Sequence, residues 1–440
     1  MFCKNNTFLK LTAGFAIFFS CSTTKQQQNR DNREISAPVI LTDTNRTDGF
    51  LETLLKKYPQ YFDHILNHRM DLNVQIIYTQ INWGANGIPD LKHHYFNVNE
   101  ARYFYPASTV KLPAVLLALQ KLNGLKEKGI DRNTAMITET AYSGQTAVYN
   151  DPSTADGKPS IAQYIKKILM VSDNDAFNRL YEFLGQAYFN NELQKKGYTN
   201  ARILHRLDIF LNEEENRHTN PVTFLNSKNE VLYLQNEQRN TEKYLLRNDS
   251  LGKAYYKGKT LMETAMDFTK KNRLSLEDLH NILISLVFPE KVKSNQRFNI
   301  TAEDRNFVLK YMSQYPTESV YPSYAADTVH YWPTYCKFLL FGAGKENPPE
   351  NIRIFNKVGD AYGHMIDVAY VVDYKNKVEF FVSAVMYCNS DGVLNDDKYD
   401  YDTLGFPFMK NLGKVIYEYE LNRNYKIKPN LSTVTFSYDK

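Results

Sequence analysis

Three apolar stretches near the carboxyl end of this 440-residue chain most strongly limit the folds that it can adopt. Residues 352–358, 365–374 and 378–387 are rich in Val, Ile, Phe and Tyr, and short polar segments separate them. This pattern predicts three successive strands.

Further strands and helices are predicted on both sides of a long middle section. Residues 73–78 and 95–98 have strand patterns with glycines and a proline between them, which indicates a hairpin. Apolar residues recur at helical spacing in 49–67 and 403–419, and most of 159–340 is predicted to be helix and loop. We therefore expect an α+β fold with an inserted all-helical lobe.

Composition places the chain among ordinary globular proteins. Hydrophobic residues make up 43% and charged residues 23%, and 53 Lys and Arg oppose 49 Asp and Glu. Lys4 and Lys10 lie in a segment that we expect to be removed, so the charge that remains is 51 − 49 = +2. Since no basic block is present, nucleic acid is not an expected partner.

The amino-terminal segment predicts export. Residues 1–20 combine early lysines with a short apolar run, as in a secretory signal, and Cys21 follows a small residue as in a bacterial lipoprotein. We expect lipidation of Cys21, a polar tether over 21–48, and a cell-envelope location facing the periplasm or the surface. Cys336 and Cys388 could form one disulfide there.

Ser108 and Lys111 are the first candidate catalytic pair. A spacing of three residues places them on one face of a helix, where the amine can reach the hydroxyl. The same spacing occurs elsewhere in the chain, but Ser108 alone opens a strongly apolar helix, which extends to about Leu122. The alternative is an ordinary serine at the start of a helix.

Two further motifs follow in the order that one enzyme family uses. Ser172-Asp173-Asn174 ends an apolar segment, and Lys357-Val358-Gly359 ends a predicted strand. Together with Ser108-x-x-Lys111, they resemble the penicillin-recognising serine hydrolases, and the chain is identified as a divergent, lipoprotein-type member of the class A β-lactamase family. The resemblance covers about residues 50–425 and implies a β-lactamase/transpeptidase-like fold, in which an antiparallel sheet is flanked by terminal helices and carries the inserted all-helical lobe.

The resemblance also implies residue roles. Ser108 would attack an amide carbonyl, Lys111 would accept its proton, and Ser172 would relay the proton to the leaving nitrogen. The other matched positions would bind substrate, and the backbone N–H groups of Ser108 and Asp360 would form an oxyanion hole. These binding positions are Asn174, Asn212, Lys357, Gly359 and Asp360.

Asp208 departs from the family pattern, which has a glutamate for deacylation. The run from Arg206 to Asn212 otherwise matches the family loop, with Asp208 at the glutamate position and Asn212 as its assisting amide. Aspartate is shorter by about one C–C bond, roughly 1.5 Å, so slow deacylation is expected. Asp208 could instead pair with Arg206 or Arg179. One of Glu213–Glu215 could take the role of the family glutamate, but we expect this run to be a solvated face or the start of a helix.

Two other features affect the substrate. Val358 replaces a family hydroxyl, which should weaken binding of a β-lactam carboxylate by about 1.5–3 kcal/mol. Residues 226–259 form a polar, tyrosine-containing insertion, which is either a rim over the cleft or a solvated excursion. His64 and His68 share a helix face but have no third ligand nearby, so no metal or other cofactor is expected.

The sequence thus predicts one catalytic domain over 49–425 and a tail over 426–440. The expected function is a monomeric serine hydrolase that forms an acyl-enzyme at Ser108 and acts on β-lactam amides. The alternatives are a peptidase or amidase acting on a peptidoglycan-derived substrate, and a non-hydrolysing penicillin-binding or sensor module. The expected partners are a small-molecule substrate and a membrane, held through the lipid anchor.

Overall fold

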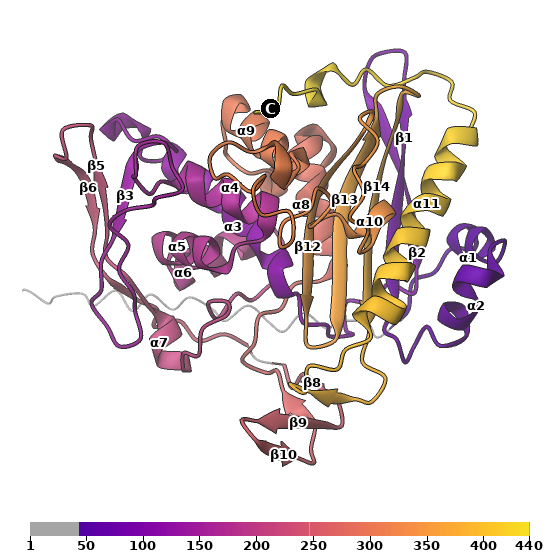
Figure 1. Cartoon of the computed structure of the whole chain (residues 1–440), viewed down its shortest axis with the longest axis horizontal. Helices are drawn as coiled ribbons and strands as arrows, with labels where there is room; N and C mark the ends of the chain where they lie inside the picture. Colours follow the sequence, from indigo (N-terminus) through magenta and orange to yellow (C-terminus); the bar gives the residue numbers. More distant parts are fainter. Residues whose placement is uncertain (1–43, 246, 440) are drawn as a thin grey trace, which may run out of the picture. The chain divides into compact units, whose positions relative to one another are not determined.

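A computed structural model describes residues 44–245 and 247–439 (Figure 1). The predicted signal at 1–20, the lipidation site Cys21 and nearly all of the 21–48 tether lie outside the described residues. Among the helices that are described, none has both the length and the hydropathy needed to span a membrane.

A five-stranded antiparallel sheet organises the fold, with strand order β12-β13-β14-β1-β2. The three predicted carboxyl-terminal strands and the predicted hairpin are confirmed. The strands are β1 (Gln75–Trp83), β2 (Pro89–Phe96), β12 (Ile352–Ala361), β13 (His364–Asp373) and β14 (Val378–Tyr387).

Helices cover both faces of this sheet, which explains why β13 is buried along its whole length. Successive side chains of a strand point to opposite faces, so Val368 and Tyr370 join one core and Ala369 and Val371 the other. Figure 1 shows α11, α1 and α2 on one face and α8 on the other. These helices are α1 (Gly49–Leu55), α2 (Pro59–Asn67), α8 (Leu276–Val287) and α11 (Phe406–Asn422).

A second lobe forms around α3 (Lys111–Asn123), which is buried on nearly every side. Its residues from Leu112 to Leu119 are all buried, so this helix packs as a core element and not as an amphipathic surface helix. The helices packed near it are α4 (Ile161–Val171), α5 (Asn174–Leu184), α6 (Gln186–Lys195) and α9 (Ala302–Ser313).

The α+β class is confirmed, but the description of this lobe as all-helical is too simple. A three-stranded antiparallel sheet, β3-β5-β6, belongs to it, and the prediction of helix and loop is wrong for the short strands that lie between residues 218 and 267. Short apolar runs do not distinguish strand from helix, which explains the error. The strands are β3 (Ala135–Thr138), β4 (His218–Thr219), β5 (Val222–Leu225), β6 (Val231–Gln235), β7 (Gln238–Arg239), β8 (Ser250–Leu251), β9 (Ala254–Lys257), β10 (Thr260–Met262) and β11 (Met266–Asp267).

The predicted insertion at 226–259 divides between two places. Strand β6 extends the small sheet of the helical lobe, whereas β9 pairs with β10 and, in parallel, with β15 (Val393–Leu394). Figure 1 shows β9 and β10 projecting below the main sheet. The remaining short helices are η1 (Ala107–Val110), η2 (Lys126–Lys128), α7 (Glu213–Arg217), η3 (Pro289–Lys291), η4 (Ser294–Gln296), η5 (Pro316–Glu318), α10 (Phe338–Phe341), the π-turn η6 (Tyr401–Gly405) and η7 (Ser432–Val434).

The carboxyl-terminal segment and the cysteines each add a detail. Leu431 and Val434 are buried in the main core, so the segment after α11 packs against the domain. Cys336 and Cys388 are both buried and free, and the disulfide considered from the sequence is not formed. Cys388 packs close to Gly405, whereas the backbone carbonyl of Cys336 accepts a hydrogen bond from β12.

Truncation of α3 tests how far the fold depends on this central helix. Leu117→Ala removes a fully buried side chain and should lower the free energy of unfolding by about 2–5 kcal/mol. Leu234→Ala makes the same change on β6, where the side chain is 52% exposed, and should change it by about 0.5 kcal/mol or less. Urea unfolding followed by circular dichroism measures both, and equal losses would contradict the assignment of α3 to the core.

Candidate active site

Ser108 lies in η1, where the chain turns into α3. Ala107, which precedes it, has φ +46°, a left-handed conformation that is uncommon for alanine. Strand β12 passes very close to this turn at Gly359. A Cβ atom at Gly359 would lie 2.9 Å from the Ser108 backbone nitrogen and 3.0 Å from the Pro106 carbonyl oxygen. Only glycine therefore allows β12 to approach the backbone that carries Ser108.

Lys111 lies one turn after Ser108, and its amine is fully buried. Its Nζ is 2.8 Å from Ser108 Oγ and donates to the Ser172 carbonyl oxygen at 2.5 Å and to Asn174 Oδ1 at 2.6 Å. The predicted contact between Ser108 and Lys111 is therefore present. The Lys111 amine also contacts two residues of the predicted Ser-Asp-Asn motif.

Burial holds the pKa of Lys111 well below its ordinary value, and the nearby charge of Lys357 lowers it further. A neutral amine has two N–H groups and one lone pair. Because the Ser172 carbonyl and Asn174 Oδ1 can only accept, they take both N–H groups, and the lone pair is left to face Ser108 Oγ. This arrangement suits Lys111 to accept the serine proton.

Ser172 connects Lys111 with Lys357. It caps α4 with φ +59°, and the next residue, Asp173, begins α5 by accepting a hydrogen bond from the Ala176 backbone N–H. The Ser172 hydroxyl is 3.3 Å from Lys111 Nζ and accepts a hydrogen bond from Lys357 Nζ at 2.8 Å. The turn between two helices therefore places this hydroxyl between the two buried amines.

Lys357 lies on β12 and is buried, and its Nζ also donates to the Val358 carbonyl at 2.8 Å. Burial lowers its pKa to about 8, so most of the population is charged at neutral pH. Sheet and lobe therefore each supply one amine to the same hydroxyl, and the two amines differ in protonation.

Asp208 shares the cleft with Ser108 and Asn174. Its Oδ2 accepts a hydrogen bond from Asn174 Nδ2 at 3.4 Å, which orients the amide so that Oδ1 faces Lys111. The alternative in which Asp208 pairs with Arg206 or Arg179 is wrong, because both guanidinium groups pair with Glu182.

Asn212 does not share this position. Its side chain caps α7 by accepting from the Glu215 backbone N–H at 2.9 Å, and the Glu215 carboxylate accepts from the Asn212 N–H in return. The capping box uses Asn212 structurally, and Glu213–Glu215 form the first turn of α7 as predicted. Among the described contacts, none joins Asn212 to Ser108, Lys111 or Asp208, so the structure separates it from the predicted site.

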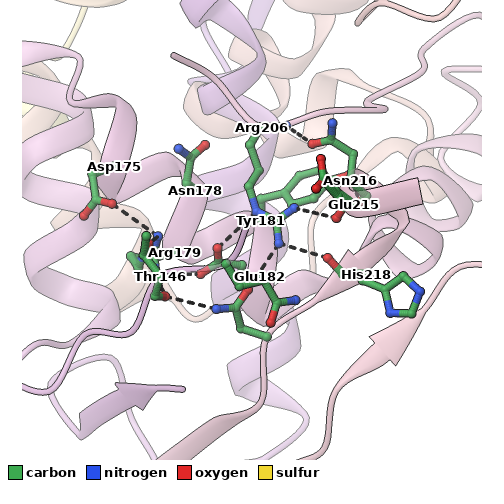
Figure 2. Close-up of polar contacts among 12 residues, drawn as sticks. Thr146, Asp175, Asn178, Arg179, Tyr181, Glu182, Arg206, Glu215, Asn216 and His218 are labelled. Atoms are coloured by element: carbon green, nitrogen blue, oxygen red, sulfur yellow. Dashed lines mark hydrogen bonds and ion pairs between the residues drawn. The ribbon is translucent and has the colours of Figure 1, made fainter. Parts of the chain in front are cut away.

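The loop that carries Asp208 is anchored by a buried ionic cluster (Figure 2). The Glu182 carboxylate on α5 accepts a hydrogen bond from Arg206 Nε at 3.1 Å through Oε1. Its other oxygen, Oε2, lies 3.0 Å from Arg179 Nη1. Arg206 also donates to the backbone carbonyls of Glu215 and His218, at the far end of the loop. One arginine thus ties the start of the loop to its end and to α5.

The cleft has a volume of about 990 Å³ and a rim of tyrosines that the sequence motifs did not reveal. Tyr255 and Tyr256 come from β9, so this part of the predicted insertion lines the cleft. The tyrosines are far apart in the sequence, and no spacing would have identified them. The five that line the cleft are Tyr105, Tyr255, Tyr256, Tyr362 and Tyr399.

The two histidines of α2 lie at the protein surface. His64 and His68 are exposed, and their rings are 4.6 Å apart between centroids. Within residues 44–245 and 247–439, no group of three or more His, Cys, Asp or Glu side chains is arranged to hold a metal ion.

Comparison with known proteins identifies the family. Residues 66–419 match the family described as "Beta-lactamase enzyme family". The match covers most of the chain, and the chain belongs to this family of serine hydrolase enzymes. The fold and the three motifs agree with the class A resemblance seen in the sequence.

Solved structures that resemble the chain have low sequence identity. A β-lactamase from Burkholderia phymatum is 14% identical, covering 83% of this chain and 98% of its own, with a TM-score of 0.45. A halotolerant bacterial β-lactamase is 15% identical (82% and 99% covered, TM-score 0.45), as is a class A β-lactamase from Clostridium kluyveri (82% and 98%, TM-score 0.44). No curated protein matches the chain.

The buried cluster under the loop is testable by a change of charge. Glu182→Gln leaves Arg179 and Arg206 without their shared carboxylate and should lower the free energy of unfolding by about 3–5 kcal/mol. The control is Glu303→Gln, which removes one carboxylate from Arg132 at a site where the Glu303 side chain is 78% exposed. Glu303→Gln should lower the free energy of unfolding by about 0.5 kcal/mol or less. Denaturant unfolding distinguishes the two, and a Glu182 effect no larger than the control would contradict the anchoring role.

Proposed function

We propose that the chain is a serine hydrolase that forms an acyl-enzyme at Ser108, with β-lactam amides as its substrates. The observation that carries the proposal is the contact of Lys111 Nζ with Ser108 Oγ at 2.8 Å, made by an amine whose buried position favours the neutral form. A neutral amine at hydrogen-bond distance is the general base that a serine nucleophile requires.

Acylation would use the two lysines in different protonation states. Ser108 Oγ attacks the amide carbonyl and passes its proton to Lys111, and Ser172 carries a proton to the leaving nitrogen. The charged amine of Lys357 donates to Ser172 Oγ, so the hydroxyl hydrogen of Ser172 is free to point toward the substrate. The same charge would attract the substrate carboxylate.

The backbone N–H groups of Ser108 and Asp360 are the proposed oxyanion hole. Gly359 brings β12 against the Ser108 turn, and both Ser108 and Asp360 line the cleft. A single donor of this kind typically contributes about 3 kcal/mol to the transition state.

Asp208 is the proposed base for hydrolysis of the acyl-enzyme. It lies in the same cleft as Ser108, and Asn174 holds its carboxylate. Since Asn212 is committed to a helix cap, the water would be positioned without that amide. We therefore expect deacylation to be the slow step.

A lasting acyl-enzyme would favour the sensor alternative. One observation favours a peptidoglycan-derived substrate. Val358 is buried and offers no hydroxyl beside Lys357, while the cleft, at about 990 Å³, is at the upper end for small-molecule sites.

We also propose, from residues 1–48 of the sequence, that Cys21 carries a lipid and holds the enzyme in the cell envelope.

Intact mass after exposure to a penicillin or a cephalosporin tests the proposed nucleophile. The wild-type chain should gain the mass of the whole penicillin, or of the cephalosporin with or without the group that leaves from its C3′ position after ring opening, and Ser108→Ala should gain nothing. An adduct that disappears over time indicates a lactamase, and one that persists indicates a sensor or peptidase. No adduct on the wild-type chain would overturn the β-lactam assignment.

Asp208→Glu tests the deacylation step separately. The longer side chain extends the carboxylate by roughly 1.5 Å toward the acyl group and should speed loss of the adduct by about tenfold or more. Asp208→Asn, which keeps the length and removes the base, should prolong the adduct. Unchanged adduct lifetimes in both variants would show that Asp208 is not the base.

The acylation rate should depend on pH through both lysines. Because Lys111 must be neutral, acylation should fall as the pH drops through its lowered pKa. Because Lys357 must be charged, acylation should also fall as the pH rises through about 8. Stopped-flow measurement of acylation against pH tests this, with thermal unfolding at each pH as the control. A rate that keeps rising well above pH 8 would show that the charge of Lys357 is not needed.

A further inference from the structure

Lys271 is a cation inside the cleft that has no partner in the described part of the chain. It lines the active-site cleft together with Ser108, and it also lines an adjoining cavity of about 490 Å³. Its neighbour Lys270 forms an ion pair with Glu213 at 2.7 Å. For Lys271, within residues 44–245 and 247–439, there is neither an ion pair nor a side-chain hydrogen bond.

The position of Lys271 is fixed by the next residue, Asn272, which is fully buried. Asn272 Oδ1 accepts from the backbone N–H groups of Leu204 and His205, at 2.7 and 3.1 Å. Its Nδ2 donates to the His205 carbonyl at 3.2 Å. This amide bonds the Lys271 turn to the segment that leads into Asp208, so Lys271 is held on the Asp208 side of the cleft.

Aromatic rings line the cleft together with Lys271. Burial lowers the pKa of His205 to about 4, so its ring is neutral at physiological pH. The His205 ring stacks on Tyr105 with the planes 2° apart and the centroids at 6.1 Å. The Tyr105 ring also meets Tyr362 edge-on at 5.0 Å. Tyr105, His205 and Tyr362 therefore offer aromatic surface in the cleft that Lys271 also lines.

Among the described residues, no carboxylate of the cleft forms an ion pair with Lys271; the cleft carboxylates are Asp208, Asp267, Asp360 and Asp397. Asp208 accepts from Asn174, and Asp267 accepts from the Thr269 backbone N–H at 2.7 Å. Partial burial lowers the pKa of Lys271, and no nearby carboxylate opposes that shift. An amine held in this way gains more from a ligand anion than a fully solvated lysine does.

We propose that Lys271 binds a carboxylate on the acyl side of the substrate, beside a ring that packs on Tyr105 and Tyr362. This inference rests on the proposed function, which assigns the two sides of the cleft. Ser172 faces the leaving nitrogen, whereas Asn174 and Asp208 face the acyl side, where Lys271 is held. The enzyme therefore selects substrates whose acyl arm carries an aromatic ring and a negative charge.

Carbenicillin and benzylpenicillin are a matched pair of probes, because they differ by one carboxylate on the acyl arm. The measurement is the ratio of their acylation efficiencies, from the rate of adduct formation. In Lys271→Gln the acylation efficiency of carbenicillin divided by that of benzylpenicillin should fall about tenfold. In Lys271→Arg this ratio should stay near the wild-type value. Lys270→Gln removes an equal charge from the adjacent residue, which lines only the adjoining cavity, and should leave the ratio unchanged.

Binding of the acyl arms alone decides the inference even if no penicillin reacts. N-methyl phenylmalonamate carries the ring and the carboxylate, and N-methyl phenylacetamide carries only the ring. Ligand-observed NMR with the intact chain should show preferential binding of the anionic arm in the wild type and loss of that preference in Lys271→Gln. Failure of both penicillins to acylate would overturn the proposed function only. The role of Lys271 would be overturned if Lys271→Gln still preferred the anionic ligand as the wild type does. It would also be overturned if Lys271→Gln weakened the binding of both ligands equally.

Discussion

The burial of one amine, Lys111 Nζ, is the constraint on which the site depends. Helix α3 is buried on nearly every side, so the lysine in its first turn lies in a region of low dielectric. Its partners come from η1 and from the junction of α4 and α5. The same interactions that satisfy the amine therefore bring Ser108, Ser172 and Asn174 to one point.

The main sheet reaches this point through β12. Lys357 donates to Ser172 Oγ, and Gly359 lets the strand lie against the backbone of Ser108. The buried amines repel each other, which favours loss of a proton from Lys111 while Lys357 stays charged. Two lysines close to one hydroxyl can thus act as a base and as an electrostatic binding group.

The catalytic cluster and most of the sheet could be predicted from the sequence, because local patterns determine them. A spacing of three residues places Ser108 and Lys111 together on a helix, and apolar runs mark the strands from 352 to 387. The short strands between 218 and 267 were missed because runs of two to five residues have no distinctive period. The free thiols of Cys336 and Cys388 depended on tertiary packing, which spacing does not reveal.

The roles of loop residues were the hardest to predict. Asp208 lies in the cleft as expected, but Asn212 follows a stronger local preference and caps a helix that three glutamates begin. Lys271 and Tyr105 belong to no motif, yet both line the cleft. Asn272 joins the Lys271 turn to His205, which is 67 residues away and whose ring stacks on Tyr105. A strong local preference for helix capping therefore determines the role of Asn212. Tertiary contacts determine the places of Lys271 and Tyr105.

The protonation state of Lys111 is the central claim, and NMR of the chain with ¹³C-labelled lysine measures it directly. The ε-carbon signal of Lys111 can be assigned by comparison with the Lys111→Arg variant. The account predicts that this signal shows a neutral amine at physiological pH, when the exposed lysines are all charged. A Lys111 signal that titrates together with the exposed lysines would contradict the account.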